Sequence, residues 1–128
     1  MIDRSAESRG MNMRREAITV ENIRAVAPSE RVECVYIGRA NRAFGLAASP
    51  LANPYTVREH GTTRALALYR RWLHEDIKVW GPAHSELSRL VEMLRRGERV
   101  RLLCYCAPGP CHGEIVKAAL LWMMEDAR

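Results

Sequence analysis

The sequence predicts an α/β fold, a single small domain in which helices flank a partly parallel sheet. Two observations lead to this prediction. Short segments rich in β-branched and aromatic residues alternate with longer segments whose apolar residues recur at helical spacing. The chain has 128 residues, enough for one continuous hydrophobic core. We therefore expect one domain over residues 17–128, after a mobile N-terminal tail over residues 1–16 that lacks apolar periodicity.

Three strands are expected. The first begins at Ala17, where apolar and polar residues start to alternate. The second covers residues 32–39, rich in Val, Tyr and Ile, and the third covers residues 99–105. If these two strands are parallel, Arg39 and Cys106 lie at the same carboxyl edge of the sheet. That edge is where open α/β sheets bind ligands.

Three helices are expected as well. Thr62 and Thr63 are expected to cap the first, which Gly81 and the following proline end. The second stops at Gly97. The last runs from residue 113 to about 126 and follows the third strand after one loop, a Rossmann-like strand–loop–helix at the C-terminal end.

Other stretches carry weaker signals. Residues 40–60 form a long irregular segment, and loops of this length are usually functional or disordered. Trp72 and Trp80 fall at helical positions, so we expect them in the core rather than as base-stacking platforms. Cys34 and Cys104 sit in predicted strands, and we expect both in the core because free cysteine is among the most buried residue types.

The composition limits the class of protein. No apolar run reaches the roughly 20 residues that span a bilayer, and the polar N-terminus is not a secretory signal. We therefore expect a cytoplasmic protein with reduced thiols. The net charge of +5 permits a nucleic-acid partner, but the arginines are scattered and not interleaved with aromatics, which favours a solvated basic surface. No feature favours or excludes an oligomer.

The most informative stretch joins the last strand to the last helix and reads Cys-Tyr-Cys-Ala-Pro-Gly-Pro-Cys-His-Gly-Glu over residues 104–114. It places thiols, an imidazole and a helix N-terminus together, which suits a metal, an anion or a nucleophilic step. Cys111 is the best nucleophile candidate, because a thiol at the positive end of a helix has a lowered pKa. His112 is a candidate acid, base or ligand.

Two further side chains are candidates for catalysis. Adjacent residues seldom face each other, so we do not expect a direct proton-transfer pair of Cys111 and His112. A contact of Cys106 with His112, or one through a substrate, is easier to build. Glu114 is a candidate acid–base group, although a carboxylate in the first turn also simply favours the helix dipole.

The alternative interpretation is that the loop binds zinc. Cys104, Cys106, Cys111 and His112 would supply four ligands of the right softness. The sequence has no Cys-x-x-Cys knuckle, and this spacing makes a cramped cage, so we favour a site without zinc.

Residues elsewhere would complete a ligand site. Gly38 and Arg39 end the second strand, where the guanidinium is placed to hold a phosphate or carboxylate. Asn53 precedes a proline in a turn, and its amide is a candidate to orient a ligand. At Gly113 the N-terminus of the last helix would bind the anion.

Three ordered motifs carry a family resemblance. They are Tyr-Ile-Gly-Arg at residues 36–39, Asn-Pro-Tyr at residues 53–55, and the Cys-x-Cys-Ala-Pro-x-Pro-Cys-His-Gly run at residues 104–113. From about Ile18 to its C-terminus the chain resembles a phage and bacterial group, domain-of-unknown-function family 4326. A similar ending occurs in family 488 of the same naming scheme, a likeness at the level of the fold.

The resemblance implies that Arg39, Asn53, Cys106, Cys111 and His112 converge, because they are the family's motif positions. The sequence departs from the family pattern in three places. Alanine replaces a glycine at residue 52, glutamate replaces an aspartate at residue 114, and residues 41–48 look like an insertion.

Two hypotheses of function follow. In the first, the chain is a small α/β enzyme or binder of a nucleotide-like or phosphorylated molecule, which uses the cysteine–histidine loop. In the second, it is a non-catalytic module whose loop holds zinc and which contacts nucleic acid or a protein.

Overall fold

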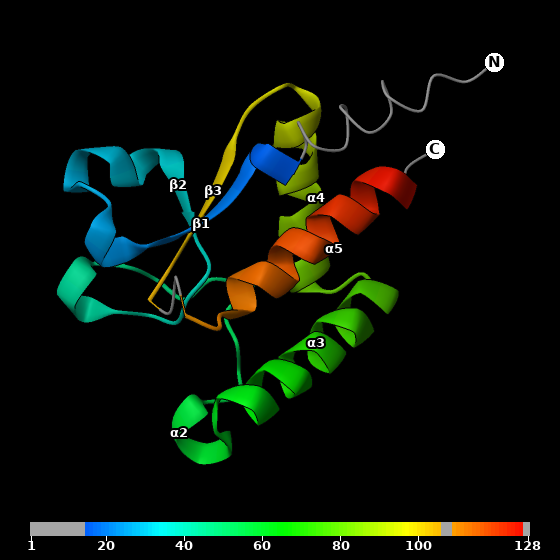
Figure 1. Cartoon of the computed structure of the whole chain (residues 1–128). Coiled ribbons are helices and arrows are strands. Elements are labelled where there is room, and N and C mark those ends of the chain that lie inside the picture. Colours follow the sequence, from blue (N-terminus) through cyan, green and yellow to red (C-terminus); the bar gives the residue numbers. More distant parts are fainter. Residues whose placement is uncertain (1–14, 106–108, 127–128) are drawn as a thin grey trace.

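The computed structural model describes residues 15–105 and 109–126, and Figure 1 shows their arrangement. The predicted tail over residues 1–16 falls outside these ranges except for its last two residues. The strands are β1 (Ile18–Asn22), β2 (Cys34–Tyr36) and β3 (Val100–Cys104). The α-helices are α2 (Val57–His60), α3 (Thr62–Lys78), α4 (Pro82–Arg95) and α5 (His112–Asp126). Short 3-10 helices are η1 (Ile23–Ala25), η2 (Pro28–Glu33) and η3 (Arg42–Phe44).

The sheet has three strands in the order β1-β3-β2, and both neighbouring pairs are parallel. The expected α/β fold is therefore confirmed, and the sheet is parallel throughout the described strands. Leu102 of β3 pairs with Val20 of β1 and with Val35 of β2. Because β2 and β3 run the same way, the segment after Tyr36 and the segment after Cys104 leave the sheet at one edge.

One face of the sheet forms the main core. Helices α4 and α5 contact this face, and α3 packs against both of them (Figure 1). Side chains alternate along β3, so Leu102 and Cys104 point into this core with Val35 and Ile37. Helix α5 contributes Val116 and Leu120 to this core, and both are fully buried.

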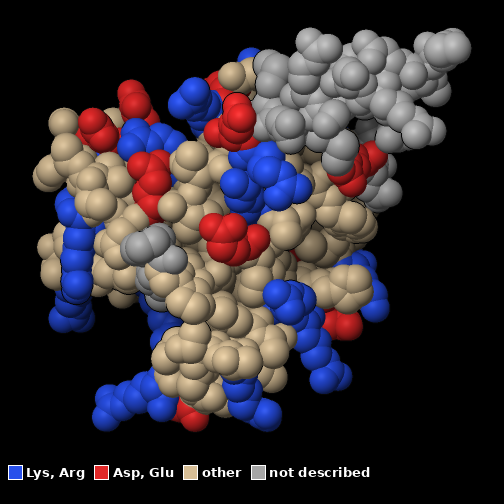
Figure 2. Space-filling model, viewed as in Figure 1, with Lys and Arg blue, Asp and Glu red and all other residues tan. Residues whose placement is uncertain are grey.

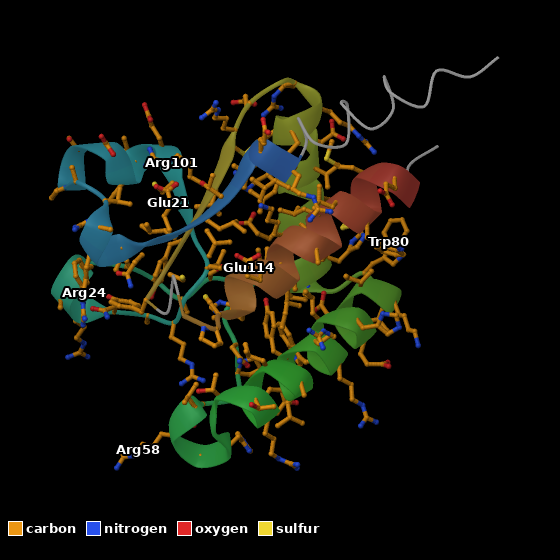
Figure 3. The ribbon with its side chains drawn as sticks, viewed as in Figure 1. Glu21, Arg24, Arg58, Trp80, Arg101 and Glu114 are labelled. Atoms are coloured by element: carbon orange, nitrogen blue, oxygen red, sulfur yellow. The ribbon has the colours of Figure 1, made fainter. Side chains whose placement is uncertain are left out.

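The opposite face is covered by η1, η2 and the segment around η3 rather than by long helices (Figure 1). Ile23, Val26 and Leu103 make a smaller apolar cluster there. Beside it Arg101 donates from Nε and Nη2 to the two carboxylate oxygens of Glu21, each at 2.9 Å (Figure 3). A hollow of about 1020 Å³ is lined by this ion pair and also by Glu86, Arg89 and Met93 of α4.

Several predicted boundaries are wrong. The second strand is shorter, because Val32 and Glu33 belong to η2, where Val32 is 86% exposed. Thr62 and Thr63 are the first residues of α3 and do not cap it; Gly61 precedes the helix, and no side chain caps it. The irregular segment over residues 40–60 contains η3 and α2, and the side chain of Thr56 caps α2.

Trp80 corrects the prediction of a core tryptophan. Helix α3 ends at Lys78, and Trp80 has a left-handed φ of 56° that carries its side chain outward, where it is 77% exposed. Figure 3 shows it at the far end of α3 from the sheet edge. Trp72 does pack against the core. Cys34 is only half-buried, on the face of the sheet that carries Arg101.

None of the described helices has the length and apolar character needed to cross a membrane. On the face shown in Figure 2, basic and acidic side chains are intermingled.

Candidate functional site

A pocket of about 290 Å³ opens at the carboxyl edge of the sheet. The segment after β2, the turn at Asn53 and the start of α5 form its walls. The pocket brings together predicted residues that are far apart in the sequence. Those lining it are Gly38, Arg39, Asn53, Cys104, Cys111 and His112. Its volume is at the lower end of the range for small-molecule sites.

Cys111 is the residue immediately before α5. The N–H of Glu114 donates to its carbonyl at 3.2 Å, and the N–H of Gly113 donates to its Sγ at 3.3 Å. The sulfur thus accepts a hydrogen bond from one of the backbone groups that a helix N-terminus leaves unsatisfied. The side chain is only 4% exposed, and it lines the pocket. A negative sulfur is favoured at this position by the helix dipole.

His112 has two different nitrogen environments. Nε2 lies 2.7 Å from the carbonyl oxygen of Ile37. A carbonyl only accepts, so we assign the hydrogen to Nε2, which leaves a lone pair on Nδ1 of the neutral ring. Burial lowers the pKa of His112, and nearby Arg39 lowers it further, although the hydrogen bond to Ile37 opposes this. The imidazole is therefore neutral at neutral pH.

The lone pair of His112 is close to Cys111. Nδ1 lies 3.8 Å from the Sγ of Cys111. The expectation that these adjacent residues would not face each other is wrong, because Cys111 precedes the first helical residue and His112 is that residue. Tyr69 fixes the ring from the other side, with an edge-to-face contact of 5.1 Å between centroids. The hydroxyl of Tyr69 is in turn anchored to the carbonyl of Leu51 at 2.7 Å.

Cys104 contributes a second sulfur. It is the last residue of β3, and its Sγ lies 3.1 Å from that of Cys111. Cys106, the third predicted cysteine of the loop, lies outside the described residues. Within residues 15–105 and 109–126, no three His, Cys, Asp or Glu side chains form a group able to hold a metal ion.

Arg39 is held at the pocket by the turn that contains Asn53. Its Nε and Nη2 both donate to the carbonyl oxygen of Asn53, at 2.9 and 2.7 Å. The side chain of Asn53 is used inside the turn, because its amide donates to Ala65 and its Oδ1 accepts from the N–H of Tyr55. Asn53 therefore positions the arginine, and Nη1 of Arg39 has no hydrogen-bond partner among the described residues.

The two predicted glycines allow close packing. A Cβ at Gly38 would lie against the ring of Tyr36, whose hydroxyl donates to the carbonyl of Arg39. A Cβ at Gly113 would lie 2.6 Å from Cγ1 of Val20. At both positions the absence of a side chain is explained by neighbouring atoms of the fold.

Glu114 is not part of this pocket. It is exposed on the first turn of α5 (Figure 3) and lines a different hollow, which Trp122 also lines. The sequence analysis did not single out Tyr105, which does line the pocket. The buried hydroxyl of Tyr105 has no hydrogen-bond partner among the described residues. Its position between the two cysteines of the Cys-Tyr-Cys motif is the feature of the sequence that could have indicated it as a pocket residue.

The chain matches a known protein family. Residues 20–122 match the family described as a domain of unknown function (DUF4326). The chain belongs to this family. The matched range of DUF4326 includes every residue that lines the pocket. No curated protein and no solved structure matches the chain significantly.

Proposed function

We propose that the pocket binds a small anionic molecule, nucleotide-like or phosphorylated, and that Cys111 acts on it as a nucleophile. The observation that carries this proposal is the geometry of Cys111 and His112. The unprotonated Nδ1 of a neutral imidazole lies 3.8 Å from a sulfur that also accepts a backbone N–H at a helix N-terminus. This arrangement combines a proton acceptor with stabilisation of the thiolate.

The reaction would proceed by a balanced displacement. The thiol of Cys111 gives its proton to Nδ1 of His112 as the sulfur attacks an electrophilic carbon of the substrate. The bond from that carbon to the leaving group breaks, and the leaving group keeps the electron pair. The imidazolium then returns the proton to the leaving group, which yields a thio-linked intermediate and the protonated leaving group.

Two groups support an anionic ligand. Arg39 is fixed at the pocket by two hydrogen bonds to Asn53, and its Nη1 remains available to a phosphate or carboxylate. Tyr105 also lines the pocket, and its buried hydroxyl would gain a hydrogen bond from any ligand acceptor that reached it.

Thiol labelling and ligand binding test this proposal together. We expect iodoacetamide to label Cys111 faster than Cys34, and the H112Q variant to slow labelling of Cys111 only. Nucleotides and sugar phosphates should raise the melting temperature of the wild type, and R39M should abolish the rise. Cys34 is the matched control, since it is half-buried on the other face of the sheet. Equal labelling rates with no melting shift would refute the proposal.

A zinc-holding module that contacts nucleic acid or a protein is the second candidate. Its support is the hydrogen bond from Nε2 of His112 to the carbonyl of Ile37, an arrangement common among zinc-bound histidines. Cys104, Cys111 and His112 do not by themselves form a metal-holding group, so the module would need a further ligand from outside the described residues. Metal analysis of the untagged protein separates the two candidates. One zinc per chain with unreactive thiols would support the module.

A further inference from the structure

Cys104 and Cys111 are placed to react with each other. Their Sγ atoms lie 3.1 Å apart, about 1 Å more than the roughly 2.05 Å of a disulfide bond. The two sulfurs come from different elements, since Cys104 ends β3 and Cys111 precedes α5. A small movement of the end of β3 and the start of α5 toward each other would therefore bring the two sulfurs to bonding distance.

The surrounding structure keeps the sulfurs together. Cys104 is the last residue of β3, the central strand of the sheet, and pairs in register with Asn22 of β1, which fixes its backbone. Cys111 is fixed by the hydrogen bonds that begin α5. Burial of a cysteine in a core requires no second sulfur beside it, so packing alone does not account for this pairing.

A small oxidant can reach both sulfurs through the pocket. Cys104 and Cys111 are 1% and 4% exposed, yet both line the 290 Å³ pocket. Hydrogen peroxide is small enough to enter a pocket of this volume. Thiols at helix N-termini with a second thiol in reach are the ones that peroxides oxidise reversibly.

We propose that Cys104 is a resolving thiol, which forms a reversible disulfide with Cys111 and thereby switches the pocket off. The thiolate of Cys111 attacks one oxygen of hydrogen peroxide, the O–O bond breaks, and Cys111 becomes a sulfenic acid while hydroxide leaves. The sulfur of Cys104 then attacks Sγ of Cys111, the S–O bond breaks, and water leaves with the proton of the Cys104 thiol. Two thiols are oxidised, and one peroxide is reduced to two waters.

The consequence of the disulfide rests on the proposed function, because it removes the nucleophile. The bond itself does not depend on that function. A dithiol such as dithiothreitol would reverse it by thiol–disulfide exchange.

The experiment treats the full reduced chain with hydrogen peroxide and maps disulfides by peptide mass spectrometry. We expect a loss of two hydrogen atoms, a Cys104–Cys111 cross-link, and loss of iodoacetamide labelling at Cys111 that dithiothreitol restores. Mapping on the wild type needs no variant to fold. A cross-link that involves Cys106 instead, no internal cross-link, or protection of both thiols by bound zinc would each overturn the proposal.

Variants separate this inference from the proposed function. C104S should keep the labelling of Cys111 but form only its sulfenic acid, which dimedone traps, and C34S should behave as the wild type. A reactive Cys111 that never joins Cys104 refutes the switch alone. The cross-link could instead form while Cys111 labels no faster than Cys34 and no ligand raises the melting temperature. That result would refute the proposed function alone.

Discussion

Replacing Gly113 by alanine tests whether the start of α5 is held by its packing on β1. An ideal Cβ there would lie 2.6 Å from Cγ1 of Val20 and 3.3 Å from Cδ1 of Ile37. The shorter distance is about 1 Å below ordinary carbon contact, so the helix or the strand must shift. Overpacking of this kind costs about 1–3 kcal/mol, while alanine gains up to about 1 kcal/mol over glycine in a helix.

The net expectation is a destabilisation of about 1–2 kcal/mol, or a fall in melting temperature of about 4–8 °C for a chain of this size. Thermal and urea unfolding followed by circular dichroism would measure it. Ala118→Gly is the matched control, because Ala118 is exposed on the same helix and reports helix propensity alone. If Gly113→Ala were as stable as the wild type, packing would not explain Gly113, and close approach of a ligand would remain as the reason.

Three further predictions concern stability. Tyr69→Phe should cost about 1–2 kcal/mol in urea unfolding, because the buried carbonyl of Leu51 loses its 2.7 Å donor; an unchanged midpoint would contradict this. The hydrogen bond from Arg101 lowers the pKa of Glu21 below its ordinary 4.5. The ionised Glu21 therefore stabilises the fold above pH 4.5, and this stabilisation is lost as the pH falls through the pKa of Glu21 in the folded protein. The stability difference between wild type and Glu21→Gln should therefore shrink in that acid range, and a constant difference would refute the assignment. Burial holds the pKa of His112 below 6.5. The contribution of the neutral imidazole to folding stability is therefore complete above pH 6.5 and declines as the pH falls through the pKa of His112 in the folded protein. The His112→Gln variant should lack this decline in a plot of unfolding free energy against pH.

Side-chain alternation and β-branched content are local properties, and they were enough to predict the strands over residues 32–39 and 99–105. The placement of Arg39 near the loop at residues 104–114 depended on the condition that these strands are parallel, and the structure meets this condition. The same local rules failed for Trp80, because apolar spacing does not show where a helix ends. They also failed for Val32, which follows Pro28 in a 3-10 helix rather than extending the strand.

The sequence by itself determined the α/β class, the main helices and the resemblance to the family, since each depends on residue types and spacing within single segments. Only the tertiary structure decided how the motif residues are used. It showed that Asn53 holds Arg39 through its carbonyl, that Glu114 lines a different hollow, and that the sulfur of Cys111 lies near Nδ1 of His112. These contacts depend on distances between segments, which cannot be predicted from the order of the segments along the chain. A shift of a few ångströms at the start of a helix changes which atoms are in contact.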